Sequence, residues 1–192
     1  MKRWIATLLM PLLVACGNVP PAPIDHFYRL QPIVLSATAP KPGIGAIAVH
    51  TFRADSLYAE RPIVYADAAN LRQLRQHHYH LWLYPPAQLV QAHFEASLGS
   101  VLNFKAEGPA PYSLDGRVLG FERVFSSNNC KAALSLELRL MKADKMLLQK
   151  IYSVEKEATE DSLPAFAIAM EQALAKVYTD FLGDLNALSP DY

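Results

Sequence analysis

The sequence predicts an α+β fold in which two helices pack on one face of a single, mostly antiparallel sheet. Three observations in the second half of the chain support this prediction. Apolar and polar residues alternate through 134–140, which is typical of a strand with one buried face. The polar turn 142–145 then predicts a hairpin partner over 146–156. The run 163–185 repeats apolar residues at helical spacing, and such a stripe must be buried against another layer.

Further strands are expected earlier in the chain. Short runs of alternating or β-branched residues are bounded by prolines and polar turns, as strands usually are. The turn 67–70 lies between two such runs and predicts a hairpin. The expected strands cover residues 27–30, 44–52, 61–65, 71–76 and 112–125.

Both expected helices have start signals. Pro85 and Pro86 suit the first turn of a helix, because proline has no N–H to leave unbonded there, and helical spacing then continues to Gly99. Ser162 is a good N-cap for the second helix, with Pro164 in its first turn.

Length and composition indicate one globular domain. The chain has 192 residues, 52% of them apolar, which is enough for a sizeable core and excludes a disordered protein. Formal net charge is zero; without residues 1–15 there are 16 basic and 18 acidic side chains, because Lys2 and Arg3 are removed. Nucleic-acid binding requires a concentrated basic surface, so no nucleic-acid partner is expected.

The first sixteen residues predict export and lipid attachment. Lys2 and Arg3 precede an apolar stretch, 4–14, of the size found in signal peptides and too short to span a bilayer. The junction that ends in Ala15 and Cys16 resembles the lipobox of bacterial lipoproteins. We therefore predict that Cys16 carries the lipid anchor.

The resulting organisation has three parts. Residues 1–15 are the expected signal peptide, 16–25 the lipidated cysteine with a proline-rich linker, and 26–188 the α+β domain. The linker favours extended polyproline II and would act as a semi-rigid spacer. Gly17, where an aspartate would favour retention at the inner membrane, points to the periplasmic face of the outer membrane.

The second cysteine is then left without a disulfide partner. If Cys16 carries lipid, Cys130 is a lone thiol. We expect it to be a small buried hydrophobic residue; a reactive role is the alternative.

The only dense histidine cluster is His77, His78 and His80. On a regular strand His78 and His80 share a face while His77 points away, so the run supplies two metal ligands at most. No acidic or cysteine partner lies nearby in sequence to complete a zinc set. We expect polar and aromatic packing on an edge strand, and no metal site.

Nothing in the sequence points to an enzyme. It has no glycine-rich phosphate loop, no Gly-x-Ser-x-Gly elbow and no His-Glu-x-x-His motif. Asp55, Glu60 and Asp67 are scattered in expected loops, where carboxylates are usually solvated. No catalytic residue and no cofactor is predicted.

Two segments resemble a known family. The stretch 52–65, and the stretch 80–86 with the helix that follows it to Leu98, are similar to the ABC-type transport auxiliary lipoproteins, which include the PqiC-like lipoproteins. The similarity runs from about Tyr28 to Leu185. Its most telling element is an aromatic strand end followed by Pro-Pro. There Tyr65, Trp82 and Tyr84 are expected to stiffen the strand-to-helix corner. The three are large amphipathic rings.

The resemblance implies a role in the cell envelope. It implies a lipid-anchored docking component that works with an ABC permease and ATPase and with an MCE-type periplasmic protein, moving lipids or other hydrophobic molecules. No ATP-binding loop is present in this chain, so the energy would come from a partner. A self-assembling structural lipoprotein is one alternative. A lipid carrier is another, and it would need an apolar cavity of a few hundred Å³.

Overall fold

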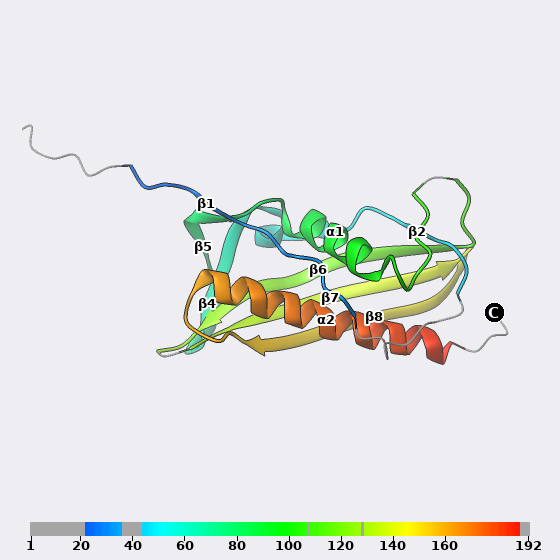
Figure 1. The fold of residues 1–192 in the computed structure, drawn as a ribbon. Coiled ribbons are helices and arrows are strands. Elements are labelled where there is room, and N and C mark those ends of the chain that lie inside the picture. Colours follow the sequence, from blue (N-terminus) through cyan, green and yellow to red (C-terminus); the bar gives the residue numbers. More distant parts are fainter. Residues whose placement is uncertain (1–21, 36–43, 107, 128, 189–192) are drawn as a thin grey trace, which may run out of the picture.

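The computed structural model describes residues 22–35, 44–106, 108–127 and 129–188. Within these ranges, α1 (Pro86–Leu98) and α2 (Leu163–Ala187) cover one face of a single mixed sheet, and the opposite face carries no helix (Figure 1). The predicted α+β fold is therefore confirmed. The strands are β1 (His26–Tyr28), β2 (Ile47–Val49), β3 (Arg53–Ala54), β4 (Pro62–Asp67), β5 (Asn70–Trp82), β6 (Tyr112–Phe125), β7 (Cys130–Lys142) and β8 (Lys145–Glu157), with a 3-10 helix at Ser56–Ala59.

Strands β6, β7 and β8 form a long antiparallel meander. Leu136 of β7 lies level with Val118 of β6 and Tyr152 of β8, and all three side chains are buried beneath the helices. Lys142 pairs with Lys145 across the turn between β7 and β8. The expected strands 112–125, 134–140 and 146–156 all lie within these elements, because their alternating pattern is local.

The other edge of β6 is parallel, which the sequence pattern did not predict. β2, β3 and β4 pair with successive parts of β6 in parallel, and β1 pairs in parallel with β5. The connection from β4 to β6 passes through β5 and α1, and parallel strands need a crossover of this kind. The expected strand 44–52 is reduced to β2, with β3 beginning at Arg53. The sheet is still mostly antiparallel.

Both helices begin where the sequence predicts. The Oγ of Ser162 accepts a hydrogen bond from the Ala165 N–H at 3.2 Å, and Pro164 occupies the first turn of α2. Helix α1 starts at Pro86 and ends before Gly99. No helix in the described ranges is long and apolar enough to cross a bilayer. The fully buried large side chains between helices and sheet include Trp82, Phe94, Phe121, Phe166, Tyr178 and Phe181.

A segment after β1 crosses the helix layer. Residues 30–35, here called the crossing segment, pass between α1 and α2 (Figure 1). The Gln31 N–H donates to a carboxylate oxygen of Glu171 on α2 at 2.7 Å, and the Ile33 N–H donates to Ser97 Oγ on α1 at 3.1 Å. Leu30 is buried at one end of the segment. The N-terminal part of the domain therefore holds the two helices together.

Candidate functional site

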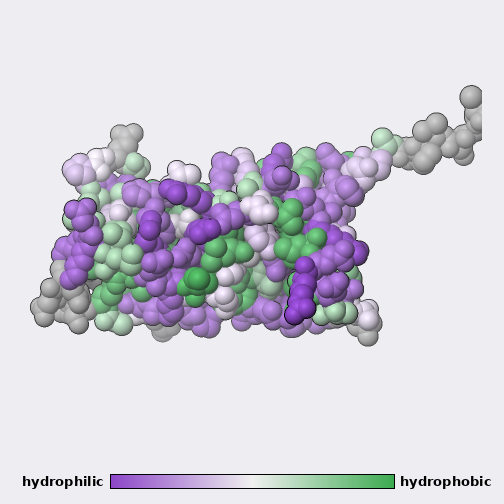
Figure 2. Space-filling view, turned by 180° about the vertical axis from the view of Figure 1, so that it is seen from behind, coloured by the Kyte–Doolittle hydropathy of each residue, from purple (hydrophilic) through white to green (hydrophobic). Residues whose placement is uncertain are grey.

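The face of β6, β7 and β8 opposite the helices, here called the open face, follows directly from strand alternation. Leu136 and Leu138 are fully buried beneath the helices, so Glu137 and Arg139 point to the other side. Figure 2 shows the molecule from this side, as a mainly hydrophilic surface with smaller hydrophobic areas between the polar side chains. A sheet with one buried and one polar face is typical of antiparallel strands.

Asp115 is the centre of the polar network on the open face. Its two carboxylate oxygens bond to different elements: Oδ2 accepts from the Arg139 guanidinium on β7, and Oδ1 lies next to His50 Nδ1, each at 3.2 Å. Partial burial alone would raise the pKa of Asp115, but the hydrogen bonds from His50 and Arg139 and the arginine's charge lower it below its ordinary value. The carboxylate is therefore ionised at neutral pH.

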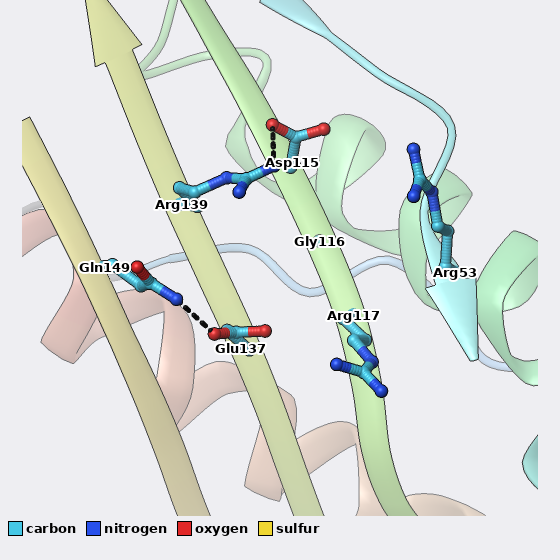
Figure 3. Close-up of a pocket in the computed structure, with 7 residues that line it drawn as sticks. All are labelled: Arg53, Asp115, Gly116, Arg117, Glu137, Arg139 and Gln149. Carbon is cyan, nitrogen blue, oxygen red and sulfur yellow. Dashed lines mark hydrogen bonds and ion pairs between the residues drawn. The ribbon is translucent and has the colours of Figure 1, made fainter. Parts of the chain in front are cut away.

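A second set of polar side chains lies beside Asp115. Gln149 on β8 donates to Glu137 on β7 at 2.7 Å, and Arg117 on β6 forms an ion pair with Asp55. Figure 3 shows Gln149, Glu137 and Arg117 with Arg53 of β3 around a shallow cleft on the open face. The cleft has a volume of about 180 Å³ and is lined by Arg53, Asp115, Gly116, Arg117, Glu137, Arg139 and Gln149.

The cleft offers binding groups of both signs. Arginine forks and carboxylates held in place by neighbours present donors and acceptors in fixed directions, which suits a polar protein surface or an extended peptide. The His50–Asp115 contact orients an imidazole, but no Ser, Thr or Cys side chain within the described ranges is hydrogen-bonded to that ring.

The sequence pattern predicts only part of this site. Glu137 and Arg139 belong to the alternation over 134–140, whereas no local pattern marks Asp115 or His50. These two are brought together because the His50 N–H donates to the Leu114 carbonyl at 2.9 Å, just beyond the parallel β2–β6 pairing. A parallel pairing between distant segments leaves no periodic signal in the sequence.

The expected geometry of the histidine cluster was wrong. His77 and His80, not His78 and His80, lie together, with ring centroids 5.4 Å apart. The register shifts between Pro62 and Val64, and this bulge reverses the alternation along β5. The parallel β1–β5 pairing adds His26, which stacks on His80 at 5.0 Å.

Two histidines of this cluster, His77 and His80, have lowered pKa values. Burial, followed by the positive charges of His80, Arg123 and His78, lowers the pKa of His77 to about 4. Burial and His26 also lower the pKa of His80, whose Nδ1 lies 3.0 Å from the Tyr28 hydroxyl. In the described part of the chain, no group of three or more His, Cys, Asp or Glu side chains is placed to hold a metal ion.

The aromatic corner is only partly as expected. Trp82 is fully buried, with its ring 5.1 Å from that of Phe121 and 5.7 Å from that of Phe166, so it joins β5 to β6 and α2. Tyr65 lies beside His77 at 4.5 Å. Tyr84 is 48% exposed and supports the corner little.

The three loop carboxylates named from the sequence, Asp55, Glu60 and Asp67, each have a partner in the structure. Asp55 is paired with Arg117, Glu60 accepts from Gln76 at 3.3 Å, and Asp67 accepts from the backbone of its own turn. These carboxylates stabilise local geometry.

Only one of the two cysteines lies within the described residues. Cys130 is 1% exposed and has no disulfide, as expected for a small buried hydrophobic residue. Cys16 lies outside the described residues.

Comparison with known families decides the affiliation. The family described as "ABC-type transport auxiliary lipoprotein component" matches residues 28–181, most of the chain. The protein belongs to this family. The earlier resemblance is thus confirmed, and this auxiliary lipoprotein is a component of an ABC-type transport system in the cell envelope. No curated protein matches the chain.

Solved structures share the fold of this auxiliary lipoprotein. A protein from Xanthomonas campestris is 19% identical, with a TM-score of 0.69 over 82% of this chain and 93% of its own. An uncharacterised protein is 15% identical, with a TM-score of 0.64 over 86% and 98%. A hypothetical protein from Chlamydia trachomatis is 9% identical, with a TM-score of 0.51 over 74% and 98%. At these identities the likeness concerns the fold alone.

Proposed function

We propose that this auxiliary lipoprotein is a non-catalytic docking component, lipidated at Cys16 and held at the periplasmic face of the outer membrane. Its open face would bind an MCE-type protein of a system that moves lipids or other hydrophobic molecules, with an ABC permease and ATPase as the other components. The family supports a transport role, and the open face supports docking. The observation that carries the proposal is the polar network around Asp115 on a sheet face without a helix layer.

The packing between helices and sheet favours docking over lipid carriage. A carrier needs an apolar cavity of a few hundred Å³ between its layers. Here the rings of Phe94, Tyr178 and Phe181 fill that region. The centroid of the Phe94 ring lies 5.3 Å from that of Tyr178 and 5.9 Å from that of Phe181. All three are fully buried.

A photo-crosslinking pair tests the docking face. Gln149 on the open face and Gln172 on α2 are both exposed, so replacing each with p-benzoylphenylalanine gives matched probes on opposite sides of the molecule. We expect the Gln149 probe to form an adduct with an MCE-type protein, identified by mass spectrometry, and the Gln172 probe to form little.

Charge reversal makes the same test specific. Arg139→Glu should reduce the adduct yield at Gln149 by about tenfold, because it places like charges beside Asp115. Lys176→Glu on α2 is the matched control, since its side chain is 52% exposed against 43% for Arg139. Adducts between two copies of the chain alone would support the self-assembling alternative, and lipid adducts would support the carrier.

A further inference from the structure

The end of the sheet at β5 presents an apolar surface. The buried Trp82 side chain faces the helices. His80 lies on the same side of the sheet, because its ring contacts Tyr28, which pairs with Trp82. Strand alternation therefore directs Tyr79 and Leu81 to the opposite side. Leu83 continues the series, because its N–H still bonds to the Tyr28 carbonyl at 2.6 Å.

This surface extends across three strands. Leu81 of β5 lies level with Phe27 of β1 on one side and with Pro62 of β4 on the other. The exposed fractions are 53% for Phe27, 45% for Tyr79 and 40% for Leu83. The tether-side patch, as we call it, consists of Phe27, Pro62, Tyr79, Leu81 and Leu83.

A fixed arginine borders the tether-side patch. The guanidinium carbon of Arg61 lies 5.1 Å from the centre of the Phe27 ring, and its Nε donates to the Trp82 carbonyl at 3.1 Å. Arg29 is exposed and follows two residues after Phe27. Aromatic and leucine side chains bordered by arginines suit the interface of a bilayer, where rings bury their apolar edges and guanidinium groups reach the phosphates.

The patch lies at the end of the molecule where residues 22–25, the described part of the linker to Cys16, lead into β1. Figure 1 shows β1, β4 and β5 together at that end, with the chain running into β1. Phe27 follows Cys16 by eleven residues, since 27 minus 16 is 11. A polyproline II chain extends about 3.1 Å per residue, so a lipid on Cys16 would keep the patch within roughly 34 Å of the bilayer.

We propose that the tether-side patch is a second membrane contact, which rests its rings on the lipid headgroups and fixes the orientation of the domain. This inference rests on the proposed lipid anchor at Cys16. A tether raises the local concentration of the surface it faces, so a patch too weak to bind vesicles alone becomes occupied once the anchor is inserted. Asp115 lies in the half of β6 that pairs with β2, whereas β4, next to the patch, pairs with the other half. The open face around Asp115 therefore stays free for a partner.

Quenching by brominated lipids tests the proposal. Full-length lipidated protein would be reconstituted into vesicles of phosphatidylethanolamine and phosphatidylglycerol, with and without brominated acyl chains. Phe27→Trp places the probe in the patch, and Ile168→Trp on α2 is the control, because both original side chains are 53% exposed. Trp82 is buried and contributes equally to both variants. We expect quenching of the Phe27→Trp variant to exceed that of the control by about twofold or more.

The outcomes separate the patch from the anchor. Vesicle flotation is measured on the same samples, and Leu83→Trp provides a second probe in case Phe27→Trp misfolds. Flotation with equal quenching of patch and control probes overturns the membrane contact and leaves the anchored docking function intact. Failure to float overturns the anchor and, with it, this inference. Emission from Phe27→Trp that shifts with protein concentration but not with bromination would assign the patch to a second copy of the chain.

Discussion

His93 and Tyr178 are hydrogen-bonded to each other inside the helix layer, with Nδ1 2.9 Å from the phenol oxygen. The other ring nitrogen of His93, Nε2, lies 2.9 Å from the Gln31 carbonyl. Because a carbonyl only accepts, Nε2 carries the proton and Nδ1 accepts from the tyrosine hydroxyl. One neutral imidazole therefore links α1, α2 and the crossing segment.

Removing this imidazole should be costly. His93→Leu leaves the buried Tyr178 hydroxyl and Gln31 carbonyl without their partners, and we expect the free energy of unfolding to fall by about 2–4 kcal/mol. Urea denaturation followed by circular dichroism measures the loss. His78→Leu, at an exposed histidine, should change stability by less than about 0.5 kcal/mol. Equal effects of the two substitutions would contradict a structural role for the His93 network.

The same residue predicts acid sensitivity. Burial lowers the pKa of His93 from 6.5 to about 4, and the bond to Gln31 opposes this only in part. Between these pH values the unfolded chain binds a proton that the folded protein does not, so stability falls as pH drops from 6.5 towards 4. The expected loss from His93 approaches about 3 kcal/mol at pH 4. His93→Leu should flatten this part of the stability profile, and an unchanged slope would show that another group titrates.

Local patterns in the sequence predicted most of the fold, and long-range pairing accounts for what they missed. The alternation around Leu136 and the cap at Ser162 depend on neighbouring residues, and both elements are confirmed. The stacking of His26 on His80 depends on a parallel pairing between segments 54 residues apart, since 80 minus 26 is 54. No periodicity within either segment encodes that pairing.

The candidate site likewise combines residues that a local pattern marks with residues that only long-range strand pairing brings together. Arg139 belongs to an alternation visible in the sequence, but its partner Asp115 is identified only by the β6–β7 register. His50 reaches this pair because β2 joins the opposite edge of β6. The β5 bulge next to Val64 also has no clear sequence signal, which is why the faces of the histidines were misassigned.

A glycine on β6 provides a packing test. A Cβ at Gly116 would lie 2.6 Å from ring atoms of the buried Phe52, so Gly116→Ala should lower stability by about 1–3 kcal/mol. Phe52→Leu in the same chain should recover part of this loss. Gly183→Ala on α2 is the control: a Cβ there meets nothing within 4 Å, and removing a helical glycine should raise stability by about 0.5–1 kcal/mol. Urea titrations of the single and double variants decide whether overpacking is the cause.

The anchor prediction concerns the two cysteines. Cys16→Ala removes the sulfur to which the lipid would be attached, and we expect unprocessed or soluble periplasmic protein and loss of transport. Cys130→Ala is the matched control, because that thiol is buried and donates a weak hydrogen bond to the Glu160 carbonyl at 3.6 Å. It should stay with the membrane fraction, at a small cost in stability. Mass spectrometry of the wild-type N-terminal peptide should show acyl chains on Cys16. Membrane fractionation and transport retained by Cys16→Ala would mean that the anchor is dispensable.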